Sequence, residues 1–340
     1  MTGFPLWLSY GKDDISMAKN SNLHNARNTK DDEFYTQISD IEKELKHYKE
    51  YFKNAVVLCN CDDPEWSNFW RYFHLNFEHL GLKKLITTHY DVSEPTYKME
   101  YEGGNDNDVT VGDITPLKTN GDFRSPECIA LLQEATIVVT NPPFSLFRQY
   151  VAQLMEYNKS FIIIGNQNAL TGKEVFSYLR DNKMWLGYHS GDMAFRVPDD
   201  SEPRETRFWI DENGKKWRSL GNACWYTNLD ISKRHEPIDL IEKYDAEKYP
   251  KFDNYNAINV NKTLSIPYDY DGVMGVPVTM LQYHCPEQFE IIGHTHSGDD
   301  DIRVEELRTD TKNRHRGLIN GKQIYDRILI RRKEGTKNAD

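Results

Sequence analysis

The chain has 340 residues, of which 38% are hydrophobic and 28% are charged, and its formal net charge is −11. This composition is typical of a soluble globular protein that is long enough for one large domain or two ordinary ones. The chain contains no uninterrupted apolar run of the ~20 residues that a membrane-spanning helix needs, and no basic segment leading into an apolar one near its start, so we expect a cytoplasmic protein that does not bind membranes.

The first residues, 1–31, are polar and rich in Asn and Lys, and we expect them to form an extended arm. Apolar residues at helical spacing then predict a helix over 38–52. From there, predicted strands and helices alternate. Short apolar runs predict strands at 56–58, 84–88, 137–139, 161–164, 185–188 and 223–229. Helical spacing predicts helices at 66–80, 126–133, 146–157 and 174–182.

A further strand is expected near 109–111, or slightly later towards Asp122. Strands that alternate with helices predict a parallel sheet covered on both faces. The last two strands have no regular helix between them, which favours an antiparallel hairpin at the sheet edge. From about Pro237 the alternation stops, and Tyr, Asn, Asp, Pro and Gly dominate. We therefore predict an α/β domain over 32–236 and a smaller α+β region over 237–340.

The five cysteines are an odd, scattered set, which favours reduced core thiols over a disulfide framework. Cys59 and Cys61 alone suggest a metal site. However, alternation along a strand places both on one face, and neither a second cysteine pair nor a well-spaced histidine pair follows. We expect no metal.

The most informative motif follows the predicted strand at 137–139, where the chain reads Asn141-Pro142-Pro143-Phe144. The two prolines stop the strand ladder and hold the chain in a stiff, extended turn. Such a turn can present the Asn141 amide oxygen and the Pro142 carbonyl to one exocyclic NH₂ group, while the Phe144 ring stacks on the plane that carries it. The alternative is a strand followed by an ordinary proline turn.

These four residues match the [DNS]-P-P-[YFW] motif of amino-methyltransferases, and further blocks extend the match. In chain order, the blocks are 32–37 (DEFYTQ), 60–64 (NCDDP), 121–125 (GDFRS), 141–144 (NPPF), 222–229 (NACWYTNL), 253–260 (DNYNAINV), 272–277 (GVMGVP) and 286–289 (PEQF). Together they closely resemble the EcoRI-type family of DNA adenine-N6 methyltransferases.

The resemblance implies transfer of a methyl group from S-adenosylmethionine to N6 of a flipped adenine in double-stranded DNA, leaving S-adenosylhomocysteine. It also implies a Rossmann-like, mostly parallel seven-stranded sheet with an antiparallel edge hairpin, a C-terminal target-recognition region, and the motif order of the γ group. A restriction endonuclease is implied as a functional, not physical, partner. The alternatives are an RNA adenine or protein glutamine N-methyltransferase, and a DNA-binding module without chemistry.

The same resemblance implies residue roles. The cofactor-binding residues would be Phe34, Tyr35, Thr36, Asn60, Cys61, Asp62, Asp122, Phe123 and Asn141. The loop at 60–64 departs from the wider superfamily because it contains no glycine. Asp113 competes with Asp122 as the residue that reads the cofactor's adenine, and Asp91 is a candidate for its ribose.

Catalysis would rest on Asn141, Pro142, Pro143 and Phe144, with Trp225 and Tyr226 as the opposite wall of the target-base pocket. The net charge argues against a nucleic-acid partner at first, but residues 303–333 hold ten Lys and Arg against four Asp and Glu. The apolar run at 328–330 predicts that this basic segment is folded. Candidate DNA contacts are Arg303, Arg308, Lys312, Arg314, Arg316, Arg327, Arg331 and Arg332.

Overall fold

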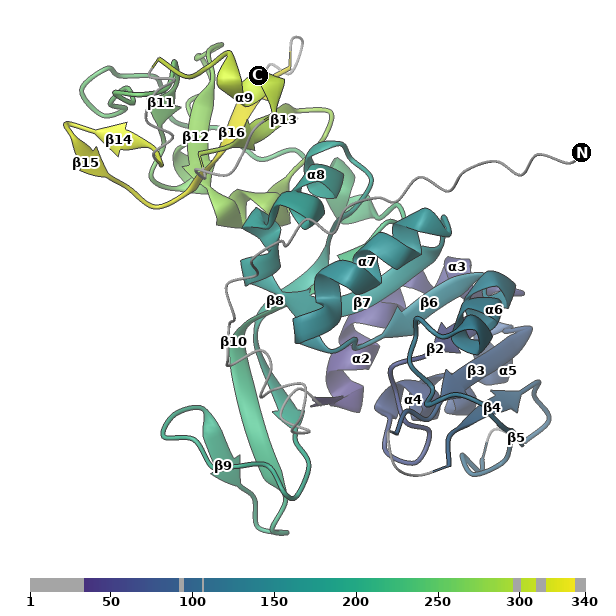
Figure 1. Cartoon of the computed structure of the whole chain (residues 1–340). Coiled ribbons are helices and arrows are strands. Elements are labelled where there is room, and N and C mark those ends of the chain that lie inside the picture. Colours follow the sequence, from purple (N-terminus) through teal and green to yellow (C-terminus); the bar gives the residue numbers. More distant parts are fainter. Residues whose placement is uncertain (1–33, 92–94, 106, 296–300, 310–315, 334–340) are drawn as a thin grey trace, which may run out of the picture.

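The computed structural model describes residues 34–91, 95–105, 107–295, 301–309 and 316–333 (Figure 1). Within these residues, the largest unit is a ten-stranded sheet in the order β1-β8-β10-β7-β6-β2-β3-β4-β5, with β9 paired to β10. Its strands are β1 (Tyr35–Thr36), β2 (Val56–Cys59), β3 (Lys84–Thr88), β4 (Tyr97–Tyr101), β5 (Asp113–Pro116), β6 (Ile137–Thr140), β7 (Ser160–Asn166), β8 (Trp185–Arg196), β9 (Phe208–Ile210) and β10 (Lys216–Thr227).

The centre of the sheet is parallel, as the sequence predicts, because β7, β6, β2 and β3 pair in that order and in one direction. Both flanks are antiparallel. The strand expected near 109–111, or slightly later towards Asp122, is found slightly later as β5, but it does not lie beside β3. Its place beside β3 is taken by β4, which runs in the opposite direction and pairs with β5. Three unexpected strands, β1, β4 and β9, account for the difference between the ten strands of the described sheet and the seven that the resemblance implied.

Helices cover both faces of the sheet, as alternation along the strands requires. Leu58, Val138 and Ile163 point into one core, together with α6 (Pro126–Glu134), α7 (Phe147–Glu156) and α8 (Lys173–Arg180). The opposite core contains the alternate strand residues Val57, Val139 and Ile162. Its helices are α2 (Ile38–Leu45), α3 (Lys49–Phe52), α4 (Asn68–Leu75) and α5 (Phe77–Leu80).

Two predicted helices are interrupted. The segment 38–52 contains a 3-10 turn, η2 (Lys46–Tyr48), between α2 and α3. The segment 66–80 begins at Asn68, because the Ser67 hydroxyl caps it by accepting from Phe69 N at 3.0 Å. It then breaks at Asn76, which separates α4 from α5. Short 3-10 turns elsewhere are η3 (Phe144–Leu146), η4 (Gln167–Thr171), η5 (Ser232–His235), η6 (Thr263–Ser265) and η7 (Val278–Tyr283).

The C-terminal region forms a second sheet of its own. Its order is β11 (Ile258–Asn259), β12 (Met274–Pro277), β16 (Arg327–Arg332) and β13 (Phe289–His294). The predicted strand inside the basic segment is therefore confirmed as part of β16. A short helix, α9 (Ile302–Glu305), and the pair β14 (Leu318–Ile319) and β15 (Lys322–Gln323) complete the region. Phe176 on α8 packs edge-on against His294 with ring centroids 4.4 Å apart, so α8 is the surface on which this sheet docks.

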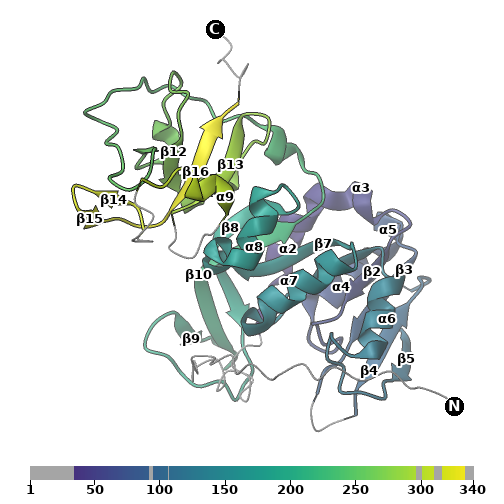
Figure 2. The same ribbon diagram turned by 45° about the horizontal axis from the view of Figure 1, so that its top comes forward.

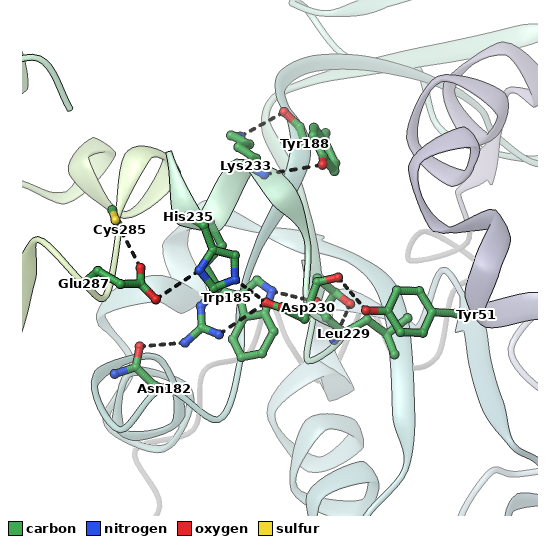
Figure 3. A network of polar contacts seen from close by, with 12 residues as sticks. Tyr51, Asn182, Trp185, Tyr188, Leu229, Asp230, Lys233, His235, Cys285 and Glu287 are labelled. Atoms are coloured by element: carbon green, nitrogen blue, oxygen red, sulfur yellow. Dashed lines mark hydrogen bonds and ion pairs between the residues drawn. The ribbon is translucent and has the colours of Figure 1, made fainter. Parts of the chain in front are cut away.

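A polar network also joins the two parts (Figure 3). His235 lies between Asp230, 2.8 Å from its Nε2, and Glu287, 3.0 Å from its Nδ1. Both ring nitrogens face carboxylate oxygens, an arrangement that favours the doubly protonated imidazole. These hydrogen bonds raise the pKa of His235. Asp230 follows β10 and Glu287 precedes β13, so His235 links the end of the large sheet to the second one.

The predicted edge hairpin is present but is much longer than expected. Pairing between β8 and β10 runs from Trp185 opposite Thr227 out to Arg196 opposite Trp217. Their outer halves, with β9 and the connecting loops (residues 191–221, here called the arm), project from the body of the protein (Figures 1 and 2). In the outer halves, buried apolar residues such as Met193 and Phe195 alternate with polar or half-buried ones, so the continuous apolar run that predicts the inner halves is missing.

All five cysteines are unpaired, which confirms the prediction of reduced thiols. No helix among the described residues is both long and apolar enough to cross a membrane. Over the same residues, no group of three His, Cys, Asp or Glu side chains lies close enough to hold a metal ion.

Candidate active site

Three loops meet at the carboxyl ends of the parallel strands, where ligands of open α/β sheets bind. The loop after β2 contains Asp62, whose carboxylate accepts from the Thr140 hydroxyl and, at 3.3 Å, from the backbone N–H of Asn141. The loop after β3 is joined to the first through Thr88, whose hydroxyl donates to Asn60 O at 3.0 Å. The predicted cofactor loop and the Asn-Pro-Pro-Phe turn therefore lie side by side.

The electrostatics of this edge are dominated by Asp62. Burial raises the pKa of its carboxyl group to about 7, although the hydrogen bonds from Thr140 and Asn141 oppose that rise. The charge of the adjacent Asp63 adds to that rise, whereas burial raises the pKa of Cys61 well above its ordinary value, so this thiol stays protonated. The Tyr150 hydroxyl donates to the side chain of Asn60. The site therefore holds one carboxyl group that changes charge near neutral pH.

The Asn141 side chain is 8% exposed and has a defined orientation. Its Nδ2 donates to the backbone carbonyl of Phe34 at 2.6 Å and lies 3.4 Å from Thr36 Oγ1. A carbonyl can only accept, so this contact decides which end of the amide is nitrogen. The other end, Oδ1, is buried and has no hydrogen-bond partner among the described residues. Asn141 therefore has one buried acceptor atom, Oδ1, that no described residue uses.

Phe34 and Phe144 lie ring to ring at this site. Their centroids are 5.3 Å apart and their planes are inclined by 23°. β1 holds Phe34 there, because it pairs with the arm at Arg196 and Phe195 and because Asn68 Nδ2 donates to Thr36 O at 2.7 Å. The predicted N-terminal block and the Asn-Pro-Pro-Phe turn are therefore in direct contact.

The loop with Asp122 and Phe123 lies against the loop that follows β3. A side chain at Gly121, which has a φ of +75°, would collide with the backbone of His89, so only glycine allows this approach. Asp122 accepts from Arg124 Nε at 2.8 Å, and the Phe123 ring packs edge-on against Tyr150 at 5.0 Å. The competing Asp113 begins β5 at the sheet's outer edge, away from these loops.

Sequence reasoning missed one aromatic side chain here. Tyr90 directly follows β3, is 48% exposed, and its backbone lies against Gly121. The candidate ribose ligand, Asp91, lies next to the same loop, because its backbone N–H donates a hydrogen bond to Asn120 O at 3.3 Å. The sequence signal for this side chain is the pair Tyr90-Asp91, which follows a predicted parallel strand at its carboxyl end.

Trp225 and Tyr226 do not form the second wall of a base pocket, which corrects our expectation. They are neighbours on β10 and therefore point to opposite faces of the sheet. Both have no exposed surface. Trp225 packs in the core that contains Phe69, whereas Tyr226 packs on Phe147 with centroids 5.0 Å apart. Of the two, Trp225 shares a cluster with Phe144.

The predicted DNA-contacting arginines are mostly engaged with carboxylates of the C-terminal region. Arg303 binds Asp301 at 2.9 Å, Arg316 binds Asp326 at 3.1 Å, and Arg332 binds Asp271 at 2.6 Å. Arg331 lies 4.0 Å from Glu290 and is 48% exposed. Lys312 and Arg314 lie outside the described residues. The basic segment is therefore more neutral in the folded protein than its composition suggests.

Two of these arginines are part of the fold, so their assignment to DNA is corrected. The Arg308 side chain has no exposed surface and lies over the Tyr255 ring, with 5.0 Å between its guanidinium and the ring centroid. Arg327 Nε donates to Asn259 Oδ1 at 3.0 Å, and burial lowers its pKa. Both side chains are used inside the second sheet.

Comparison with known proteins identifies one family over most of the chain. The family model "Adenine-specific methyltransferase EcoRI" matches residues 22–333. The chain is 47% identical to "Type II methyltransferase M.EcoRI" of Escherichia coli over 332 residues, which cover 93% of this chain and 98% of that protein.

Two mycoplasma proteins are also similar. "Type II methyltransferase M.MgeORF184P" of Mycoplasma genitalium is 36% identical over 92% of this chain and 99% of its own length. "Type II methyltransferase M.MpnI" of Mycoplasma pneumoniae is 34% identical over 92% of this chain and 98% of its own length. No solved structure gave a significant match.

Proposed function

The chain belongs to the EcoRI family of adenine-specific methyltransferases and is a site-specific DNA methyltransferase, and from this premise we propose that Asn141 directs methyl transfer to N6 of adenine. The observation that carries the proposal is the bare, buried Oδ1 of Asn141. Because Phe34 O holds the amide nitrogen, the amide oxygen is left to accept from a substrate N–H.

The amino group of adenine has two hydrogens, and the turn offers two acceptors. Asn141 Oδ1 would accept one hydrogen bond and the Pro142 carbonyl the other. Two such bonds localise the lone pair on N6, which makes this nitrogen a better nucleophile. After methylation the nitrogen loses one proton to solvent. Positioning of this kind contributes up to about 7–11 kcal/mol in model reactions.

Adenine in duplex DNA is stacked, so the target base must leave the helix before this chemistry, at a cost of roughly a few kcal/mol. Phe144 would receive it, since base–aromatic stacking contributes about 1–3 kcal/mol. In the structure the Phe34 ring lies on the Phe144 ring, 5.3 Å between centroids, which leaves no room for a base between them. We propose that Phe34 moves aside when the base enters.

The family implies S-adenosylmethionine as the methyl donor, which supplies an electrophilic methyl group when bound. The side chains at the strand ends fit it. Asp62 is an acceptor for its ammonium group, Asp122 for its adenine amino group, and Tyr90 and Phe123 are aromatic surfaces beside that carboxylate. These assignments, with Tyr35, Thr36, Asn60 and Cys61 nearby, are supported by the convergence of the three loops.

We also propose the division of labour along the chain. Residues 32–236 would form the catalytic domain and 237–340 the target-recognition region, which is supported by the two separate sheets. The N-terminal segment 1–31, which we expect to be extended, lies outside the described residues. A cytoplasmic location, a restriction endonuclease as functional partner and chemistry without a metal stay predictions from the sequence and the family.

The test of the function is Asn141→Ala, which we expect to lower kcat by at least about 100-fold, as removal of a preorganised polar group does in other enzymes. Binding of S-adenosylmethionine, measured by calorimetry, should be retained. Asn141→Asp keeps an acceptor oxygen but cannot donate to Phe34 O, so it should also lose activity. Full activity of Asn141→Ala would refute the assignment.

Labelled methyl groups offered with DNA, RNA and protein substrates would show which class is modified. Sequencing of modified bases in a host that expresses the chain would identify both the base and its sequence context.

A further inference from the structure

A hollow of about 440 Å³ lies on the arm, outside the cofactor loops. Its lining contains three arginines, two hydroxyl groups and an amide, but no carboxylate. The lining residues are Arg204, Thr206, Arg207, Arg218, Ser219, Leu220, Gly221 and Asn222. Guanidinium and hydroxyl groups around one opening are the donor set that phosphate groups prefer.

The hollow borders the position proposed for the target base. The Arg218 guanidinium lies over the Phe34 ring, 5.2 Å from its centroid. Phe34 in turn stacks on Phe144. Leu220 packs against the same apolar cluster as Phe34 and Phe144. A nucleotide whose base reaches Phe144 would therefore have its backbone next to this lining.

The hollow is a built feature of the arm. Arg207 Nη1 donates to Asp192 Oδ1 at 2.8 Å and lies 3.4 Å from Ser219 Oγ. Its backbone has a φ of 55°, an unfavourable conformation for a residue with a side chain. A Cβ at Gly221 would lie 2.7 Å from the Arg207 guanidinium, so the guanidinium lies directly against the backbone there. Backbone strain and close approach together hold a cation at the opening.

The surroundings argue against a general basic surface. Asp199, Asp200, Glu202 and Glu205 lie on the same arm, so the arm as a whole is not basic. The hollow gathers three of the arm's basic side chains around one opening with no carboxylate in its lining, and Asp192, outside the lining, pairs with one of them, Arg207. This local arrangement also explains why charge counting along the sequence did not reveal it.

We propose that the Arg204–Arg207–Arg218 hollow binds the phosphodiester backbone of the target strand beside the flipped adenine. The inference rests on the proposed function, because it uses the base position at Phe144. It places a DNA backbone contact on the arm of the catalytic domain, whereas Arg303, Arg316 and Arg332 of the basic segment pair with Asp301, Asp326 and Asp271.

The experiment compares Arg204→Gln and Arg207→Gln with Lys215→Gln, a matched loss of one positive charge on the same arm but outside the hollow. Binding to a cognate and to a scrambled duplex is measured by fluorescence anisotropy over a range of salt concentrations. Each arginine variant should reduce the slope of log K against log salt by about 0.9, on both duplexes, because one phosphate contact is lost. Lys215→Gln should keep the wild-type slope.

Arg207 also binds Asp192, so its replacement can disturb the arm, and Arg204→Gln is the decisive variant. If Arg204→Gln keeps the wild-type slope, the inference is wrong. An equal loss of slope in Lys215→Gln also overturns it, because the contact would then be diffuse. If the unaltered protein methylates no DNA, the proposed function has failed, which is a separate outcome from wild-type slopes in an active enzyme.

Discussion

Asn141 Nδ2 donates to the backbone carbonyl of Phe34 across 2.6 Å, although 107 positions separate the two residues along the chain. The donor belongs to the turn after β6, and the acceptor directly precedes β1, which ends the sheet order, whereas the cofactor strands β2 and β3 lie inside it. This hydrogen bond fixes which end of the Asn141 side-chain amide is the nitrogen. The N-terminal strand therefore helps to orient the residue proposed to direct the chemistry.

Thr36→Val is expected to weaken this orientation. The Thr36 hydroxyl is buried and lies 3.4 Å from Asn141 Nδ2, so valine removes a weak acceptor of similar shape. One neutral hydrogen bond contributes about 1 kcal/mol, which predicts a fall in kcat of about fivefold or less. Steady-state kinetics should show a lower kcat with little change in KM for DNA, and Thr36→Ser should restore kcat. A change confined to KM for DNA would contradict an orienting role.

Phe144→Ala is expected to impair capture of the flipped base. The ring is half-buried and stacks on Phe34, and its loss removes about 1–3 kcal/mol of stacking, equivalent to roughly 5- to 150-fold in base-flipping equilibrium. The measurement is the fluorescence of 2-aminopurine placed at the target adenine, which rises when the base leaves the stack. Phe144→Trp should keep the signal. An undiminished signal in the alanine variant would place the base elsewhere.

Glu44→Ala is expected to destabilise the fold without touching the site. Its carboxylate has no exposed surface and accepts from Tyr48 Oη at 2.8 Å, from Tyr188 N at 2.8 Å and from His189 N at 2.9 Å. Loss of these bonds leaves buried donors unpaired, and we expect a decrease of about 2–4 kcal/mol in the free energy of unfolding.

Urea denaturation measures this decrease, with Glu42→Ala on the exposed face of the same helix as the control. Equal stabilities of the two variants would show that the carboxylate is not needed to hold α2 on β8.

Asp62→Asn should change how stability depends on pH. Burial raises the pKa of Asp62 to about 7 in the folded protein, above the ordinary value of 3.8. The folded state therefore binds more protons than the unfolded state between these values, so this group's contribution to stability decreases as pH rises from about 4 to about 7. Thermal unfolding of the cofactor-free protein should show that decrease in the wild type and a flatter profile in Asp62→Asn. Parallel profiles would contradict the raised pKa.

Local patterns predicted the centre of the fold well. The strand at 84–88 is found with those bounds, and the strands at 56–58 and 161–164 are each found within slightly longer elements. Buried parallel strands are short, apolar and flanked by turn residues, so they are recognisable without knowledge of their partners. Half-buried and exposed strands are not, and for that reason the outer part of the arm and β4 escape recognition and the position of β5 is predicted only approximately.

The role of a side chain is harder to predict when it depends on which face of a sheet the side chain points to, or on which distant residue it contacts. Trp225 and Tyr226 are adjacent in a block that matches the family, yet the pleat of β10 sends them into different cores. Arg308 belongs to a basic run, yet it is buried over Tyr255. Composition counts charges, whereas the carboxylates that neutralise them come from distant segments.

By itself, the sequence determined the reaction class and the family, because the Asn-Pro-Pro-Phe turn and the ordered blocks around it are local and specific. Tertiary structure alone decided which end of the Asn141 amide faces the site, that Phe34 covers Phe144, and that three arginines meet on the arm. These depend on the register of β1 on β8 and of β8 on β10. Register is set by the packing of whole strands against two cores, and no short run of residues encodes it.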